Sequence, residues 1–166
     1  RMSHDIAVIG DGCAGLSLAA KANQLPDYNL TLIRPSGAPK SKDHVWGFWS
    51  DETLEDAVKL AKGTWHQWAV ITPKKHAIMS STSMPYNAIK RSDWTAHCQS
   101  LAQSSGVRII DQENWQMEDY ATVFDTRPPV APDDCILQHF HGLEIKTKTP
   151  VFEAKTAILM DLSLIH

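Results

Sequence analysis

The chain has 166 residues, of which 43% are hydrophobic and 21% are charged, and this is the composition of an ordinary globular domain with a sizeable core. Its formal net charge of −3 and its scattered lysines argue against a nucleic-acid-binding protein, which needs a basic patch to neutralise phosphates. No apolar run approaches the roughly 20 residues that cross a bilayer, whereas peripheral membrane contact through apolar loops stays open.

The chain opens with a predicted apolar strand at residues 5–9, a glycine-rich turn and a predicted helix over residues 13–24. In such a turn Gly10 allows the tight bend, Gly12 lets the backbone approach a pyrophosphate, and Gly15 lets the helix pack on the strand. The phosphates would then lie at the N-terminus of the helix. The motif predicts a nucleotide-binding turn that suits FAD at least as well as NAD, and a glycine turn without a ligand is the alternative.

The second predicted strand, residues 29–33, is followed by Arg34. An Asp or Glu at this position would accept a hydrogen bond from a ribose hydroxyl. An arginine can instead contact a 2′-phosphate, so NADP is a rival ligand, and an exposed cation without a ligand is the other interpretation. We expect Arg34 to belong to the cofactor site, with the choice between FAD and NADP left open.

The middle of the chain predicts an excursion from this first sheet. Residues 35–43 resemble a surface loop, and the dense aromatic block at residues 44–49 continues it. Further elements follow in chain order: a helix at 52–62, strands at 65–71 and 76–81, a helix at 91–104, and strands at 107–110 and 121–125.

Prolines then break the chain, and strands are predicted at residues 135–145 and 155–161 in a different sheet. The layout predicts an α/β protein with a Rossmann-like FAD/NAD(P)-binding fold of the glutathione-reductase type and the start of a β-rich substrate domain. We place the nucleotide-binding region at residues 1–127, with the excursion at 44–90, and the substrate sheet at 128–166. Because the pattern stops midway, we expect a fragment of a longer protein or a reduced form of one.

The three cysteines are odd in number, lie far apart and form no CxxC pair. They favour the reducing cytoplasm over a disulfide framework, and so we expect a cytoplasmic protein. Cys135, His139 and His141 have spacings that could place them on one face of a strand, but a fourth zinc ligand at a recognised spacing is missing, and we predict no metal site.

Several motifs resemble the bacterial type of lycopene β-cyclase, an FAD-dependent family of carotenoid cyclases. The most specific is the block at residues 44–49, His-Val-Trp-Gly-Phe-Trp, which is similar to the family's His-Thr-Trp-Ser-Phe-His. Other matching segments are Trp65, Trp68 and Val70; Tyr86 and Ile89; Asp125 and Arg127, with Pro128 in place of a glycine; and residues 138–145 and 159–161. The resemblance covers only the N-terminal portion of the family, whose acidic Phe-Leu-Glu-Glu-Thr motif would lie after residue 166.

The resemblance implies a redox-neutral cyclisation of lycopene in carotenoid biosynthesis, an isomerase or lyase reaction. An acid protonates a terminal alkene, the cation closes a ring, reduced FAD stabilises the cation, and NAD(P)H keeps the flavin reduced. It implies a carotenoid as the partner and a peripheral position on the inner membrane as an option. We expect the 166-residue chain to be inactive by itself.

The same resemblance suggests roles for particular residues. Glu144 would be the catalytic carboxyl, buried and with a raised pKa, or else an exposed cross-strand charge. His44, Trp46 and Phe48 would line the substrate pocket, or the aromatic rings would only fill the core. Arg91 would contact the flavin pyrophosphate or ribose, or be a solvated helix residue.

Two other functions stay open at this stage. The same fold start occurs in FAD-dependent monooxygenases and isoprenoid reductases, and fold alone does not fix function. A non-catalytic nucleotide-binding fragment is the third interpretation.

Overall fold

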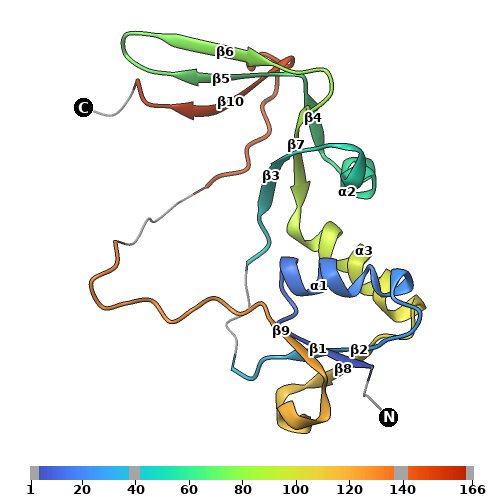
Figure 1. The fold of residues 1–166 in the computed structure, drawn as a ribbon. Coiled ribbons are helices and arrows are strands. Elements are labelled where there is room, and N and C mark those ends of the chain that lie inside the picture. Colours follow the sequence, from blue (N-terminus) through green and yellow to red (C-terminus); the bar gives the residue numbers. More distant parts are fainter. Residues whose placement is uncertain (1–3, 38–41, 137–141, 164–166) are drawn as a thin grey trace.

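A computed structural model describes residues 4–37, 42–136 and 142–163. Its central element is a four-stranded parallel sheet in the order β8-β2-β1-β9 (Figure 1). The strands are β1 (Asp5–Ile9), β2 (Asn29–Arg34), β8 (Arg108–Asp111) and β9 (Thr122–Asp125). The two central strands are apolar runs buried on both faces, as parallel strands usually are. This sheet confirms the predicted α/β, Rossmann-like layout.

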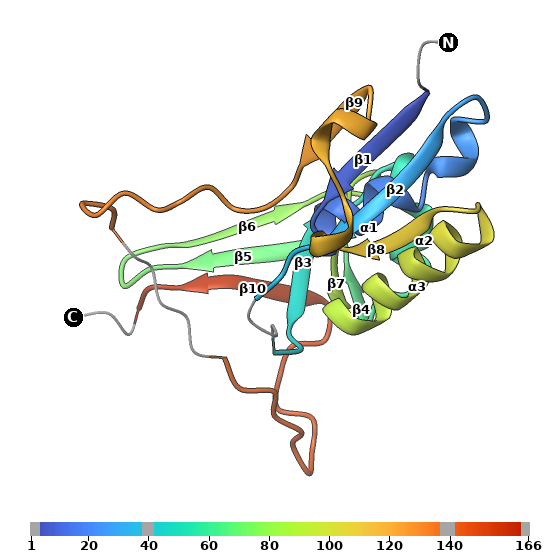
Figure 2. The same ribbon diagram turned by 90° about the horizontal axis from the view of Figure 1, so that it is seen from below.

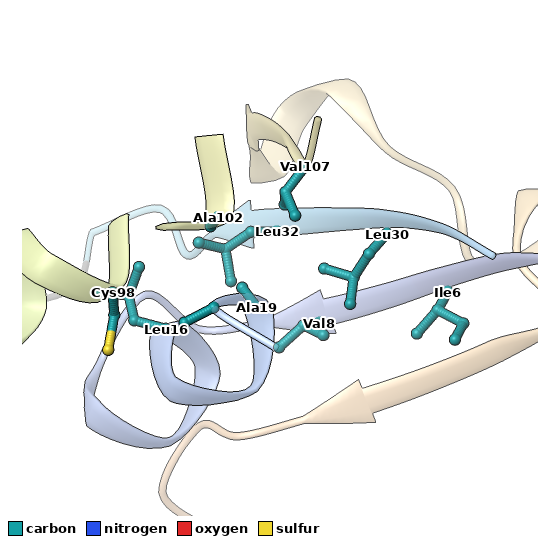
Figure 3. Close-up of a cluster of buried hydrophobic side chains, with 10 residues drawn as sticks. Ile6, Val8, Leu16, Ala19, Leu30, Leu32, Cys98, Ala102 and Val107 are labelled. Atoms are coloured by element: carbon teal, nitrogen blue, oxygen red, sulfur yellow. The ribbon is translucent and has the colours of Figure 1, made fainter. Parts of the chain in front are cut away.

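Two helices, α1 (Cys13–Ala19) and α3 (Arg91–Ser104), cover one face of the parallel sheet. Their small residues let them pack closely over the apolar side chains of β1 and β2 (Figure 3). The buried cluster consists of Ile6, Val8, Leu16, Ala19, Ala20, Leu30, Leu32, Cys98, Ala102 and Val107. The opposite face is covered by short 3₁₀ turns at Gln112–Asn114 and Met117–Asp119, where Trp115 and Tyr120 pack beneath Ile9 and Ile33.

The first helix is shorter than the predicted range of residues 13–24. It ends at Ala19, and Ala22–Gln24 form a separate 3₁₀ turn. Pro26 disfavours helical backbone at Leu25, so the chain leaves the helix before β2 begins.

The excursion forms a second, antiparallel sheet in the order β3-β7-β4. Its strands are β3 (Val45–Trp49), β7 (Tyr86–Lys90) and β4 (Gly63–Trp65), and the short helix α2 (Glu55–Lys59) follows a 3₁₀ turn at Glu52–Leu54. The prediction that residues 44–49 continue a loop was therefore wrong for 45–49. The predicted helix at 52–62 is also shorter and irregular.

A third sheet joins the two ends of the chain. Strands β5 (Gln67–Ile71) and β6 (His76–Ser80) form a hairpin, and β10 (Thr156–Asp161) adds to β5 in parallel (Figure 2). The predicted strand at 65–71 is divided at His66 between two sheets. The strand predicted at 155–161 is confirmed in its position and in belonging to a different sheet.

The prediction of a strand at 135–145 was wrong for the residues of this range that the structure describes. Residues 135–136 and 142–145 have irregular backbone and are exposed, and residues 137–141 lie outside the described residues. Pro128, Pro129 and Pro132 before this segment and Pro150 after it have no backbone N–H, so the chain that leads into and out of the segment lacks these donors for a sheet. Within the described part of the chain, no helix combines the length and apolar character needed to span a membrane.

Candidate functional site

The glycine-rich turn lies at the carboxyl end of β1, between β2 and β9. Gly10 has a φ of +112°, and its N–H donates to the Ile33 carbonyl oxygen at 2.9 Å. From the other side the Thr126 backbone N–H and hydroxyl donate to the Ile9 carbonyl oxygen at 2.9 and 2.8 Å. Hydrogen bonds from both neighbouring strands therefore fix the turn.

The surroundings of the three glycines in the turn differ in whether they leave room for a side chain. A Cβ at Gly10 would overlap the Thr126 hydroxyl, and a Cβ at Gly15 would overlap the Gly10 carbonyl oxygen. At Gly12, by contrast, a Cβ would meet no described atom within 4 Å. Packing explains Gly10 and Gly15, whereas Gly12 leaves open space above the start of α1.

The start of α1 is also free of competing groups among the described residues. Gly12 caps the helix without a side-chain hydrogen bond, and the first turn contains no acidic side chain. Backbone N–H groups at such an end attract anions. The residues present therefore fit a pyrophosphate, which needs close backbone approach and unoccupied donors.

Arg34 and Arg91 come together although they are far apart in sequence. They line a cleft of about 160 Å³ with Asp11, at the carboxyl end of β2 and the start of α3. The Arg34 Nε atom lies 3.8 Å from an Asp11 carboxylate oxygen, and both side chains are about half exposed. Sequence analysis missed Asp11, whose only signal is its position inside the glycine motif.

A second cleft, of about 540 Å³, is mostly apolar and lies beside the glycine-rich turn. Trp46 and Phe48 line it together with Cys13, Ser17 and Trp94. The Trp94 indole N–H donates to the Ser17 hydroxyl at 2.9 Å, which ties α3 to α1 below the cleft. The predicted role of Trp46 and Phe48 in substrate binding stays a prediction.

His44 and Glu144 line a different cavity, of about 740 Å³, together with Asp43, Val45 and Leu143. The His44 Nδ1–H donates to the Lys42 carbonyl oxygen at 2.8 Å, and the His44 ring meets Trp46 edge-on with 5.6 Å between centroids. The structure thus joins two of the predicted site residues here and separates them from the cleft of Trp46 and Phe48.

The environment of Glu144 differs from the buried carboxyl that we expected. Its side chain is 72% exposed, and one carboxylate oxygen accepts a hydrogen bond from the Lys62 ammonium at 2.8 Å. This hydrogen bond, with the charges of Lys62 and Lys90, lowers the pKa of Glu144. The expectation of burial and a raised pKa was wrong for the described chain, because the segment carrying Glu144 crosses a basic edge instead of entering an apolar slot.

The Asp-x-Arg segment after β9 forms a local ion pair. The Asp125 carboxylate accepts hydrogen bonds from the Arg127 guanidinium Nε and Nη2, the latter at 2.6 Å, and this arrangement lowers the pKa of Asp125.

Among the residues considered as zinc ligands, Cys135 is exposed, and His139 and His141 lie outside the described residues.

Comparison of the sequence with family models decides the family. The model described as "Lycopene cyclase protein" matches residues 5–166. The chain belongs to the lycopene cyclase family. No curated protein matches this member of the lycopene cyclase family.

Solved structures confirm the α/β, Rossmann-like fold of this lycopene cyclase family member. A tetrameric 2-methyl-3-hydroxypyridine-5-carboxylic acid oxygenase is 19% identical, with a TM-score of 0.52 over 67% of this chain and 32% of that one. P. aeruginosa PqsL in complex with 2-aminobenzoylacetate is 9% identical, with a TM-score of 0.53 over 64% and 33%. A flavin-dependent halogenase from Xanthomonas campestris is 12% identical, with a TM-score of 0.51 over 67% and 35%. The chain spans about a third of the length of these proteins.

Proposed function

We propose that this chain is the cofactor-binding portion of an FAD-dependent lycopene cyclase. The observation that carries the proposal is the family match over residues 5–166, combined with the open phosphate turn at Gly12. The turn of Gly10, Gly12 and Gly15 would hold the flavin pyrophosphate. Arg91, which shares one cleft with Arg34, would contact the pyrophosphate or ribose of the flavin, and Arg34 would offer a cation to the 2′-phosphate of NADPH.

Bound in its reduced form, FAD supplies electron density that stabilises a carbocation, and NAD(P)H serves as the reductant of the flavin. The chain's own part in the chemistry is to place apolar surface and one carboxylate near the substrate. Since the Lys62 ammonium keeps Glu144 ionised, Glu144 acts as a carboxylate that stabilises positive charge or accepts a proton. The proton donor for the first step then comes from another group.

The substrate is a linear carotenoid, and Trp46, Phe48 and His44 contribute to the walls of its site. Such a molecule partitions into the hydrocarbon core of a bilayer, so the protein works at the membrane surface as a peripheral cytoplasmic enzyme. The position at the membrane surface follows from the apolar character of the substrate.

The test is production of cyclic carotenoids by the full-length protein that contains this chain, expressed in bacteria that accumulate lycopene. Extracts from cells expressing the protein are separated by chromatography, and the proposal predicts that ring-containing product replaces lycopene. Glu144→Gln keeps the shape of the side chain and removes the charge, and it should leave lycopene unconverted while the protein stays yellow. Retained lycopene with the wild-type protein, despite bound flavin, would contradict cyclisation.

A flavin-dependent oxygenase is the second candidate, favoured by the fold shared with the pyridine carboxylic acid oxygenase. The two reactions differ in stoichiometry. An oxygenase consumes NAD(P)H and O₂ with each turnover, whereas a redox-neutral cyclase consumes neither once its flavin is reduced. Consumption of O₂ in proportion to the amount of product formed would favour the oxygenase.

A further inference from the structure

The start of α3 lies beside the start of β3, although the two are far apart in sequence. Strands β3 and β7 pair in antiparallel register, and their ladder ends where Val45 lies opposite Lys90. The chain passes from β7 directly into α3 at Arg91, with no turn between the two elements (Figure 1). Lys90 has extended backbone, with a φ of −69° and a ψ of 136°, so strand geometry continues up to the first residue of the helix.

The first two backbone donors of α3 are both bound by the residues just before β3. The Arg91 N–H donates to the His44 carbonyl oxygen at 2.9 Å, which extends the ladder by one step. The Ser92 N–H donates to one carboxylate oxygen of Asp43 at 3.0 Å, and the Ser92 hydroxyl donates to the other at 2.8 Å. The first N–H groups of a helix have no partner within it, and the Lys90 side chain makes no capping bond to the described residues. Asp43 therefore caps α3 from a position 49 residues earlier in the chain.

The Asp43 carboxylate suits this capping role. The hydrogen bond from the Ser92 hydroxyl, and after it the bond from the Ser92 N–H, lowers the pKa of Asp43. A negative charge at the N-terminal end of a helix is also stabilised by the helix dipole. Because both carboxylate oxygens bind the same residue, Asp43 fixes the orientation of the first helical turn as well as its position.

The first turn of α3 carries Arg91 at the edge of the predicted cofactor site. One stripe of the helix consists of Arg91, Thr95 and Gln99, which recur at intervals of four residues. All three line the cleft of about 160 Å³ that contains Arg34. Cys98 fixes the middle of the helix in the buried cluster, whereas the bonds from residues 43 and 44 fix its beginning. The direction of the Arg91 side chain therefore depends on those bonds.

We propose that Asp43 is a positioning residue of the cofactor site, which holds the start of α3 so that the Arg91 guanidinium reaches the pyrophosphate or ribose of FAD. This inference rests on the proposed function, in which Arg91 contacts the flavin. It adds a residue that acts on the cofactor through Arg91, since Asp43 itself lines the cavity of His44 and Glu144.

The sign of the effect separates positioning from direct electrostatics. A carboxylate repels the phosphates of FAD, so removal of Asp43 would strengthen FAD binding if its charge acted directly. Removal of a positioning residue weakens binding instead, because the Arg91 guanidinium is no longer held toward the phosphates. Weaker binding after removal of a negative charge is therefore the expected mark of positioning.

The test is FAD binding by the full-length protein that contains this chain, measured by equilibrium dialysis of the flavin-free protein. Asp43→Ala removes both hydrogen bonds to Ser92 and should weaken FAD binding about tenfold. Asp43→Asn keeps an oxygen for the Ser92 N–H and a polar group for the Ser92 hydroxyl. It should stay within about twofold of wild type, because Asn and Asp cap helices about equally well.

Asp51→Ala is the matched control. The Asp51 carboxylate also accepts hydrogen bonds from a backbone N–H and a hydroxyl, those of Thr53, at 2.9 and 2.6 Å. It caps the 3₁₀ turn that precedes α2, where no cofactor residue is predicted. Asp51→Ala removes the same kind of cap from another place in the fold, and its FAD affinity should stay within about twofold of wild type.

A double-mutant cycle shows whether Asp43 acts through Arg91. Arg91→Ala should itself weaken FAD binding at least about tenfold, and Asp43→Ala added to it should change the affinity by less than about twofold. A general effect on the fold would lower the affinity by the same factor in both backgrounds. If Asp43→Ala does not fold, Ser92→Ala removes only the hydroxyl donor and is judged in the same cycle, with an expected loss of about threefold.

Several results would overturn the inference. FAD affinity of Asp43→Ala at or above the wild-type level means that Asp43 does not position a cofactor contact. An equal loss with and without Arg91, or a comparable loss in Asp51→Ala, means that the effect is a general one on the fold. Failure of Asp43→Asn to restore binding means that the hydrogen bonds to Ser92 are not what matters.

The same measurements separate this inference from the proposed function. Wild-type FAD affinity in Arg91→Ala refutes the inference and leaves FAD binding by the protein intact. A protein that binds FAD through Arg91 and Asp43 and forms no cyclic carotenoid supports the inference and refutes cyclisation. A wild-type protein that binds no FAD refutes both.

Discussion

Gly15 packs directly against Gly10, so that a Cβ at position 15 would lie 2.9 Å from the Gly10 carbonyl carbon and overlap its oxygen. Gly15→Ala must push α1 away from β1, and it should lower the free energy of unfolding by about 3 kcal/mol. Gly12→Ala is the matched control, because a Cβ there meets open space. Thermal unfolding of both variants checks this, and equal stability of the two would contradict the packing argument.

Asp11 and Arg34 form a half-exposed ion pair in the cleft that they share with Arg91. In this chain Asp11 can supply the carboxylate that the end of β2 lacks, while Arg34 can meet a 2′-phosphate. We predict that Arg34→Gln weakens NADPH binding about tenfold and changes FAD affinity little. Equilibrium titration of each ligand measures both effects. Weaker FAD binding together with unchanged NADPH binding would show that the cleft is assigned to the wrong ligand.

The hydrogen bond from Lys62 lowers the pKa of Glu144. A carboxyl whose folded pKa is depressed stabilises the fold at pH values above its unfolded pKa, and this contribution is lost as the pH falls through the folded pKa. Lys62→Met should therefore move the pKa of Glu144 back up toward its ordinary value. NMR titration of the Glu144 side-chain carbon reports the pKa, and an unchanged midpoint would mean that the hydrogen bond does not persist in solution.

The three cysteines should differ sharply in reactivity. Burial raises the pKa of the Cys98 thiol to about 11, so that at pH 8 it is protonated and shielded, whereas Cys13 and Cys135 are exposed. A thiol reagent should therefore modify two cysteines quickly and the third only after unfolding. Cys13 follows Gly12 directly, so added FAD should slow its modification and leave that of Cys135 unchanged. Rapid modification of Cys98 in the folded protein would contradict the described packing of α1 on α3.

Local patterns predicted the tight glycine turn well, because the packing of Gly10 and Gly15 depends on neighbours in sequence and on one strand-helix contact. The meeting of Arg34 with Arg91 depends on the order of strands and on where α3 begins, and local patterns do not encode either. The two faces of β3 could have been recognised from the alternation of Trp46 and Phe48 with Gly47 and Trp49. That signal was hidden because a glycine among bulky rings suggested a loop.

Glu144 shows a different reason for failure. Its predicted burial assumed a strand over residues 135–145, and the irregular path actually taken brings it to Lys62, 82 residues earlier in the chain. A contact of this range depends on how the C-terminal segment returns across the second sheet. Neither residue carries a local signal of its partner.

Flavin content of the purified protein tests the central claim, that the turn of Gly10, Gly12 and Gly15 holds the pyrophosphate of FAD. FAD released by denaturation is measured by its absorbance and compared with protein concentration in wild type and in Gly12→Val. A Cβ at position 12 meets no described atom within 4 Å and would project into the space above α1. The account therefore predicts about one FAD per chain in the wild type and none in the variant, at equal thermal stability. Equal flavin content in both proteins would contradict it.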